Sequence, residues 1–281
     1  MKNENKSERY KKLVEKSQAE YRNHPEDHKD SNLELAAPDL KIAVVDGKIE
    51  FLQNGISFCK EINLYTYWQG FGYAEETPSI KYLLVAQDWG NPFNLNSPVM
   101  QRVIRMNNGE MNVKYLDENL NNSGTDANLV ELFKVLGYDD KEKPSIAIKR
   151  YPELFFTNFC LGYRTGRESG GLRKELMEKD KDFFKKLCEI LEPEKILCLG
   201  RLTFECAYEA LTDAKATTLT HFKDSYNKFI ENHEEIIVPC GDVEAKIHPL
   251  AHCGFYGTRN RNKGKGVSLN VQIKDWERIV E

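Results

Sequence analysis

The chain has 281 residues, 40% of them hydrophobic, with a formal net charge of -4 and a pI near 6.0. This length and composition suit one large α/β domain with a substantial core better than two independent domains. The mild acidity does not indicate a generally basic nucleic-acid binder, although an acidic protein can carry a local basic patch. No apolar stretch approaches the length of a membrane span, which argues against a membrane protein.

The seven cysteines form no CxxC pair, and the N-terminal MKNENKSERYKK has no apolar signal core. We therefore expect reduced thiols in a cytoplasmic protein. Cys188, Cys198 and Cys206 lie in apolar segments, where thiols are usually small core residues. The sequence accordingly predicts no metal site.

The first 40 residues predict an N-terminal helical extension, with a peripheral helix over Ser7 to Arg22. In the next segment, KIAVVDGKIEFL, two β-rich runs flank Asp46-Gly47, a dipeptide that tolerates the positive φ angles of a tight turn. We predict a hairpin here that decorates the main sheet.

Residues 41–281 predict a single domain in which strands alternate with helices. The predicted strands of its core cover 82–86, 154–159, 195–199, 235–238 and 243–247, and the predicted helices cover 97–106, 126–136, 180–191, 202–211 and 271–280. Asp126 is a candidate N-cap for the second of these helices, and Gly137 is its candidate stop. This order implies right-handed crossovers and a three-layer α/β/α sandwich with a mostly parallel central sheet.

Three hydrophobic runs end abruptly in polar, turn-prone clusters, and they carry the functional signal. They are KYLLVAQDWGNPF at 81–93, LFFTNFCLGYRTG at 154–166 and EAKIHPLAHCGFYG at 244–257. Ligands of open parallel sheets bind beyond the carboxyl ends of the strands, so we expect Asp88, Asn158 and His248 to converge there. A carboxylate, an amide and an imidazole make a candidate catalytic set.

These motifs resemble those of the uracil-DNA glycosylase superfamily. AQDWGNP resembles the water-activating GQDP motif, TNF the asparagine-bearing strand end, HPLAHCGFYG the HPSPLS…RGFFG loop, and EPEKILCLG a strand and glycine turn. The similarity covers roughly 81–257 in pieces, in the family's order. It implies a glycosylase-like fold and no cofactor, because the iron-sulfur branches need four cysteines with a closely spaced N-terminal pair, which this chain lacks.

The resemblance gives Asp88 and His248 catalytic roles. Asp88 would orient water and face the cationic sugar, while His248 would donate a hydrogen bond to the departing base. Asp88 can alternatively cap a turn, and His252, four residues further on, competes with His248. We place His248 first because it directly precedes a proline at the predicted strand end.

Gln87, Phe93 and Asn158 are the predicted substrate-binding residues. The Asn158 amide suits the N3 and O4 edge of an extrahelical uracil, and the Phe93 ring can stack on the base. Their ordinary alternatives are loop hydrogen bonding for the amide and simple packing for the ring. Gly90 stands where the classical enzymes carry a tyrosine that excludes thymine, which leaves base selectivity open.

Basic residues follow the second and third motifs, on the face where DNA would dock. The segment TRNRNKGKG is predicted to be flexible and able to follow a phosphate backbone, although charge runs are often only solvated surface. Leu250 is the candidate for the family's intercalating leucine, although it comes early and His252 takes the usual place. The predicted DNA contacts are Arg164, Arg167, Leu250, Arg259, Arg261, Lys263 and Lys265.

The sequence thus predicts a DNA base-excision glycosylase that hydrolyses the N-glycosidic bond of uracil, or of a related damaged base, flipped out of single- or double-stranded DNA. Two alternatives remain open. One is a catalytically silent relative that binds nucleic acid, and the other is a hydrolase of small nucleosides or nucleotides. Turnover of labelled oligonucleotides separates the glycosylase from the silent relative.

Overall fold

The architecture is α/β, with a five-stranded, mostly parallel central sheet. The computed structural model describes residues 5–23, 41–45, 48–53, 56–59, 79–87, 116–117, 125–138, 145–146, 153–161, 173–232, 234–266 and 268–280. The predicted helix at 97–106 lies outside these ranges.

The central sheet has the strand order β7-β4-β8-β10-β9. The first four strands are parallel, and β9 pairs antiparallel with β10. Its strands are β4 (Tyr82–Ala86), β7 (Leu154–Asn158), β8 (Lys195–Leu199), β9 (Ile237–Cys240) and β10 (Val243–Leu250). All five predicted core strands form, although β7 ends at Asn158 instead of Phe159 and β10 extends to Leu250 instead of ending at Ile247. The strand β9 covers 237–240 instead of the predicted 235–238.

Helices cover both faces of this sheet because the inner strands are apolar on both sides. Leu83, Val85 and Ile196 pack into one core cluster, whereas Leu84 and Leu197 pack into another. The helices are α1 (Lys6–Asn23), α3 (Thr125–Val135), α4 (Lys174–Glu178), α5 (Lys181–Leu191), α6 (Arg201–Thr212), the 3-10 turn η5 (Ala216–Thr218), α7 (Tyr226–Asn232), α8 (Phe255–Arg261) and α9 (Asn270–Val280). Residues of α3 and α9 join the second cluster, and residues of α1, α4, α5, α6 and α7 join the first.

The connections explain why the two helical layers form. The chain passes from β4 through α3 to its neighbour β7, and then through α4 and α5 back past β4 to β8. These crossovers run in opposite directions across the sheet, so crossovers of the same right hand must lie on opposite faces. The carboxyl ends of β4 and β8 therefore flank the topological switch point, where open α/β sheets bind their ligands.

Gly137 ends α3 as predicted. It has a φ of +89°. Its amide donates to the Lys134 carbonyl, and the Tyr138 amide donates to the Phe133 carbonyl, which together make a Schellman motif. Asp126 is not the N-cap, because the helix begins one residue earlier, at Thr125.

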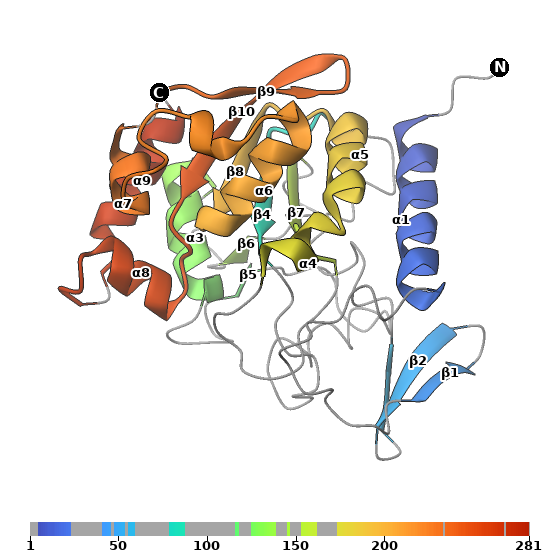
Figure 1. Ribbon diagram of the computed structural model, residues 1–281. Helices are drawn as coiled ribbons and strands as arrows, with labels where there is room; N and C mark the ends of the chain where they lie inside the picture. The colour runs from blue at the N-terminus through green and yellow to red at the C-terminus, as the bar shows by residue number, and fades with distance from the viewer. Residues whose placement is uncertain are drawn as a thin grey trace.

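The N-terminal part differs from its prediction in two respects. Helix α1 is not merely peripheral: it lies beside α5 (Figure 1), and Tyr10 and Leu13 enter the core, with the Tyr10 ring edge-on to Phe155 at 5.9 Å. The predicted hairpin forms, but β1 (Lys41–Val45) and β2 (Lys48–Gln53) pair with β3 (Ile56–Cys59) in a separate sheet and do not extend the main one. Another small sheet pairs β5 (Leu116–Asp117) with β6 (Ser145–Ile146).

Six cysteines of the described part behave as core residues. The buried free thiols are Cys160, Cys188, Cys198, Cys206, Cys240 and Cys253. Burial raises the pKa of the Cys206 thiol to about 12, so this group is protonated at neutral pH. Among the described helices, none is both long enough and apolar enough to cross a membrane.

Candidate functional site

The carboxyl edge of the sheet collects the ends of the parallel strands. Gln87 follows β4, Asn158 ends β7, Gly200 follows β8 and Ala251 follows β10. In Figure 1 the arrowhead of β10 points toward this edge, where α8 lies. Four of the predicted site residues, Asp88, Phe93, Arg164 and Arg167, lie outside the described residues.

Asn158 is a buried polar side chain at this edge. It is 2% exposed, and within the described part of the chain its side-chain amide nitrogen Nδ2 has no hydrogen-bond partner. Leaving such a donor unsatisfied costs about 1–3 kcal/mol, which a bound acceptor would recover. Asn158 therefore has the burial and the open hydrogen-bonding capacity expected of a recognition residue.

The backbone around Asn158 is held from two sides. The amide of Phe159 donates to the Ala86 carbonyl at 2.8 Å, and the amide of Cys160 donates to the Gln87 carbonyl at 3.0 Å. Leu161 donates its amide to the buried carboxylate of Asp180 at 2.7 Å. Gln87 and Asn158 thus belong to one fixed piece of backbone at the end of β4 and β7.

The two candidate histidines occupy different places. His248 lies within β10, level with Leu197 of β8, which is in turn level with Leu84 of β4. Asn158 lies level with Ala86, nearer the carboxyl edge. His252 follows the end of β10 and is half-buried. Of the two candidate histidines, it is therefore His252 that lies at the carboxyl edge of the sheet.

The hydrogen bonding of His252 defines its tautomer. Its Nδ1 atom accepts the backbone N–H of Gly254 at 2.9 Å. An atom that accepts a hydrogen bond carries no proton, so the proton of the neutral ring resides on Nε2. His252 is thereby set up to act as a neutral donor through Nε2.

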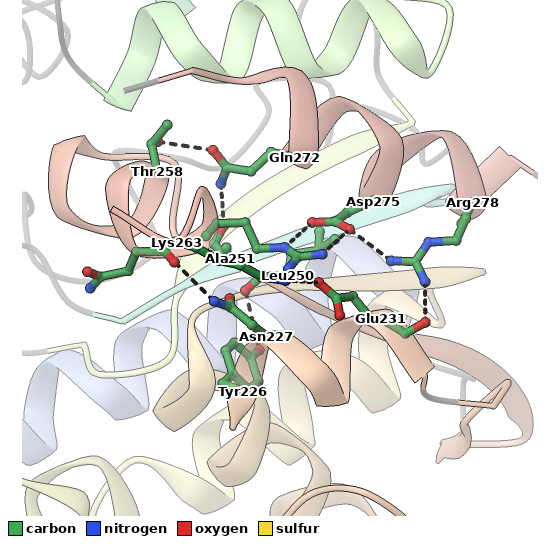
Figure 2. Close-up of polar contacts among 12 residues, drawn as sticks. Tyr226, Asn227, Glu231, Leu250, Ala251, Thr258, Lys263, Gln272, Asp275 and Arg278 are labelled. Atoms are coloured by element: carbon green, nitrogen blue, oxygen red, sulfur yellow. Dashed lines mark hydrogen bonds and ion pairs between the residues drawn. The ribbon is translucent and has the colours of Figure 1, made fainter. Parts of the chain in front are cut away.

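Three helices hold the loop that carries His252. Asn128 of α3 donates to the Cys253 carbonyl at 2.6 Å, and the Thr258 hydroxyl of α8 donates to the same carbonyl at 3.1 Å. Gln272 of α9 is 1% exposed and donates to the carbonyls of Ala251 and His252 at 3.1 and 3.3 Å. Figure 2 shows Gln272 between Thr258 and Ala251. These bonds fix the backbone at the base of the imidazole.

Two glycines let helix α8 approach His252 closely. A Cβ atom at Gly254 would lie 3.0 Å from the imidazole Nδ1 and Cε1 atoms. One at Gly257 would lie 2.0 Å from the His252 carbonyl oxygen, closer than any nonbonded contact allows. The spacing of histidine, glycine and glycine in HCGFYG is therefore a packing requirement of this site.

Gly257→Ala should displace α8 from the His252 loop. The added methyl meets backbone, which cannot rotate away, so we expect a loss of about 1–3 kcal/mol in the free energy of unfolding, together with lower activity. Urea denaturation measures the loss. Asn260→Ala, an exposed change on the same helix, is the control and should stay within about 0.5 kcal/mol of the wild type. Equal stability of the two variants would contradict this packing role.

The structure corrects the role of Arg261. Its side chain is 2% exposed and makes a bidentate pair with Asp275, from Nε to Oδ2 and from Nη2 to Oδ1, both at 2.7 Å. Nη1 donates to Glu231 at 2.9 Å, and this bond holds the pKa of Glu231 below its ordinary value. Figure 2 shows Glu231, Asp275 and Arg278 converging on this network. Arg261 joins α7, α8 and α9 and cannot serve as a phosphate contact.

Leu250 is also corrected. It is 2% exposed, because it is the last residue of β10 and faces the core cluster beneath α3 and α9. Its carbonyl accepts the Gly200 amide at 2.7 Å. A leucine held in this way cannot enter a DNA stack.

The other predicted basic contacts that follow the third motif are exposed. Arg259 lies in α8 and is exposed, as are Lys263 and Lys265. The segment TRNRNKGKG was predicted to be flexible, but it is helical as far as Arg261, which corrects that prediction. The sequence prediction missed Phe255 and Tyr256, which are 48% and 63% exposed at the start of α8. Their signal was two adjacent aromatic residues directly after the strand-end loop.

The comparisons with known proteins add no family. No family model matches the chain, and no curated protein matches it. Among the described residues, no group of three or more His, Cys, Asp or Glu side chains is placed to hold a metal ion.

Proposed function

We propose that this protein is a DNA glycosylase that resembles the uracil-DNA glycosylase superfamily and hydrolyses the N-glycosidic bond of a base flipped out of DNA. The observation that carries the proposal is the tautomer of His252, fixed at the carboxyl edge of the sheet. The ordered sequence motifs supply the family resemblance, and the α/β architecture is compatible with it.

The reaction needs stabilisation of opposite charges. As the bond between the sugar carbon C1′ and the base nitrogen breaks, the electron pair leaves with the base and positive charge develops on the sugar. Water then adds to C1′ and loses a proton, while the base gains one, which gives a free base and an abasic sugar. A fixed donor aimed at the departing base lowers the barrier without becoming charged itself.

His252 suits the role of this donor. Its Nδ1 atom is occupied by the Gly254 amide, so the hydrogen bond to the base anion would come from Nε2. The loop is already held by Asn128, Thr258 and Gln272, so little reorganisation is required at the moment of reaction. One such preorganised donor contributes about 2.7–4 kcal/mol in comparable sites.

Asn158 suits recognition of the base from the other side. The strands that carry Asn158 and His252 are separated by β4 and β8, which corresponds to about 14 Å at the usual strand spacing. A planar base over the ends of β4 and β8 would meet the amide on one side and the imidazole on the other. Its carbonyl oxygen would give the buried Nδ2 donor of Asn158 the acceptor that it lacks among the described residues.

Asp88 and Phe93 complete the proposal through the resemblance. Asp88 is the next residue in the sequence after Gln87, whose carbonyl accepts the Cys160 amide at the end of β4. A carboxylate there would orient the water and face the cationic sugar, and Phe93 would stack on the base.

A cleavage panel tests this function. Labelled oligonucleotides carrying uracil, hypoxanthine, xanthine or mismatched thymine are incubated with excess protein and then treated with alkali to break abasic sites. We expect an abasic product from at least one of them, and its loss in Asp88→Asn excludes a contaminating enzyme. Binding without any abasic product would indicate a silent relative, and hydrolysis of free nucleosides alone would indicate a small-molecule hydrolase.

A further inference from the structure

Two aromatic side chains project from the start of helix α8, directly after the His252 loop. Phe255 is 48% exposed and Tyr256 is 63% exposed, and their rings meet edge to face at 5.3 Å with an interplanar angle of 88°. The other exposed large hydrophobic residues of the described chain, Ile237, Val243 and Val280, lie on β9, β10 and α9. The aromatic pair therefore stands apart as an apolar surface beside the candidate site.

The same helix and the turn after it continue this surface with positive charge. Arg259 lies four residues after Phe255, one helical turn further on, and Lys263 and Lys265 follow. The stretch 252–266 contains no acidic residue, although the whole chain carries a net charge of -4. Since Arg261 is neutralised inside the protein by Asp275 and Glu231, the outward charge comes from Arg259, Lys265 and Lys263, whose side chain is 69% exposed although its ammonium lies 4.0 Å from Glu231.

We propose that the exposed surface of α8 and of the turn that follows it, formed by Phe255, Tyr256, Arg259, Lys263 and Lys265, binds a single-stranded segment of DNA. A base beside the flipped nucleotide stacks on the aromatic pair, and the phosphates that follow lie along the cations. This inference rests on the proposed function and extends it by naming the form of the substrate. It also replaces Leu250 with α8 as the element that meets the bases.

The single-stranded form follows from what an exposed ring can contact. Bases in a duplex stack on their neighbours and hide their faces, whereas every unpaired base offers a face to an aromatic side chain. A basic surface combined with aromatic platforms is the general arrangement for binding single strands. The place of the pair beside His252 favours DNA over an anionic membrane, because membrane binding would make no use of the neighbouring imidazole.

The test measures stacking and affinity directly. A labelled single-stranded oligonucleotide of about 15 nucleotides, with one 2-aminopurine, is titrated with the full chain and with Phe255→Ala and Tyr256→Ala. We expect each alanine variant to bind about tenfold more weakly and to lose quenching of 2-aminopurine. Phe255→Tyr and Tyr256→Phe should retain both, and Val243→Ala, which shortens an exposed apolar residue elsewhere, is the control.

The comparison with duplex DNA and with lipid decides the inference. If the alanine variants lose less affinity for the matched duplex than for the single strand, a single-stranded substrate is supported. If their affinity for the single strand is unchanged, or if they lose equal affinity for both forms of DNA, the inference is overturned. Loss of binding to phosphatidylserine vesicles with unchanged DNA affinity would also overturn it. If Tyr256→Ala still cleaves a damaged base and binds DNA as the wild type does, the binding surface is rejected and the proposed catalytic function stands. Stacking without cleavage of any substrate retains the surface and rejects the catalytic proposal.

Discussion

Replacing His252 with alanine should lower the single-turnover rate of base excision by about 100-fold or more. The change removes the Nε2 donor that the Gly254 amide has fixed in place, and so removes stabilisation that the site provides mainly in the transition state. Binding of the oligonucleotide should change little, because the base carries its negative charge only as it departs. Rapid-quench measurement at saturating protein gives the rate, and anisotropy gives the affinity.

His248→Ala provides the matched comparison for this prediction. His248 is a half-buried residue inside β10, level with Leu197, so its removal should affect stability more than the chemical step. We expect its single-turnover rate to stay within a few-fold of the wild type once the folded fraction is taken into account. A large loss in His248→Ala with normal rates in His252→Ala would restore His248 as the catalytic residue.

Asp275→Asn should destabilise the protein by about 3–5 kcal/mol. Asp275 is 5% exposed and accepts hydrogen bonds from Arg261 and Arg278. Once the Asp275 carboxylate is removed, the buried guanidinium of Arg261 keeps Glu231 as its carboxylate partner in this network. Urea denaturation followed by circular dichroism measures the free energy of unfolding.

Two variants separate the buried charge from ordinary surface pairing. Arg278→Ala removes a partner with 36% exposure and should cost no more than about 1 kcal/mol. Arg261→Met combined with Asp275→Leu removes both buried charges and should recover most of the stability. If Asp275→Asn were no more damaging than Arg278→Ala, the network would not be what holds α8 against α9.

Acid should weaken the same network through Glu231. Its pKa is lowered by the hydrogen bond from Arg261, so its contribution to stability is present above the ordinary carboxylate pKa. The contribution is lost as the pH falls through the lowered value. Removing this carboxylate with Glu231→Gln should therefore flatten the acid limb of the stability profile, measured by thermal denaturation from neutral pH downward.

Local sequence determined the core strands and their order along the chain. YLLVA, LFFTN and KILCL are continuous apolar runs, and such runs form strands that are covered on both faces. Gly137 marked the end of α3 because only a residue tolerant of positive φ closes a Schellman motif at little cost. The prediction ended the second strand at Phe159, one residue beyond its observed end at Asn158.

Tertiary pairing decided which histidine lies at the edge. The prediction ended β10 at Ile247, but the strand continues through Pro249, which pairs with Cys198 although proline lacks an N–H group. Hydrogen bonding on the β9 side of β10 ends with the Ile247 amide, which donates to the Ile236 carbonyl at 2.9 Å, so the N–H group that Pro249 lacks costs no ladder bond there within the described sheet. The strand therefore runs to Leu250 and brings His252 to its end.

The fate of the basic residues also lay beyond the sequence pattern. Arg259 and Arg261 are two residues apart and carry the same charge, yet Arg259 is exposed and Arg261 is buried. The difference arises because α8 is helical, which turns Arg261 inward toward Asp275 of α9 and Glu231 of α7. Sequence alone determined that cations follow the third motif. Which of them face solvent was decided by partners distant in the chain, because a buried charge is tolerated only where opposite charges pair with it.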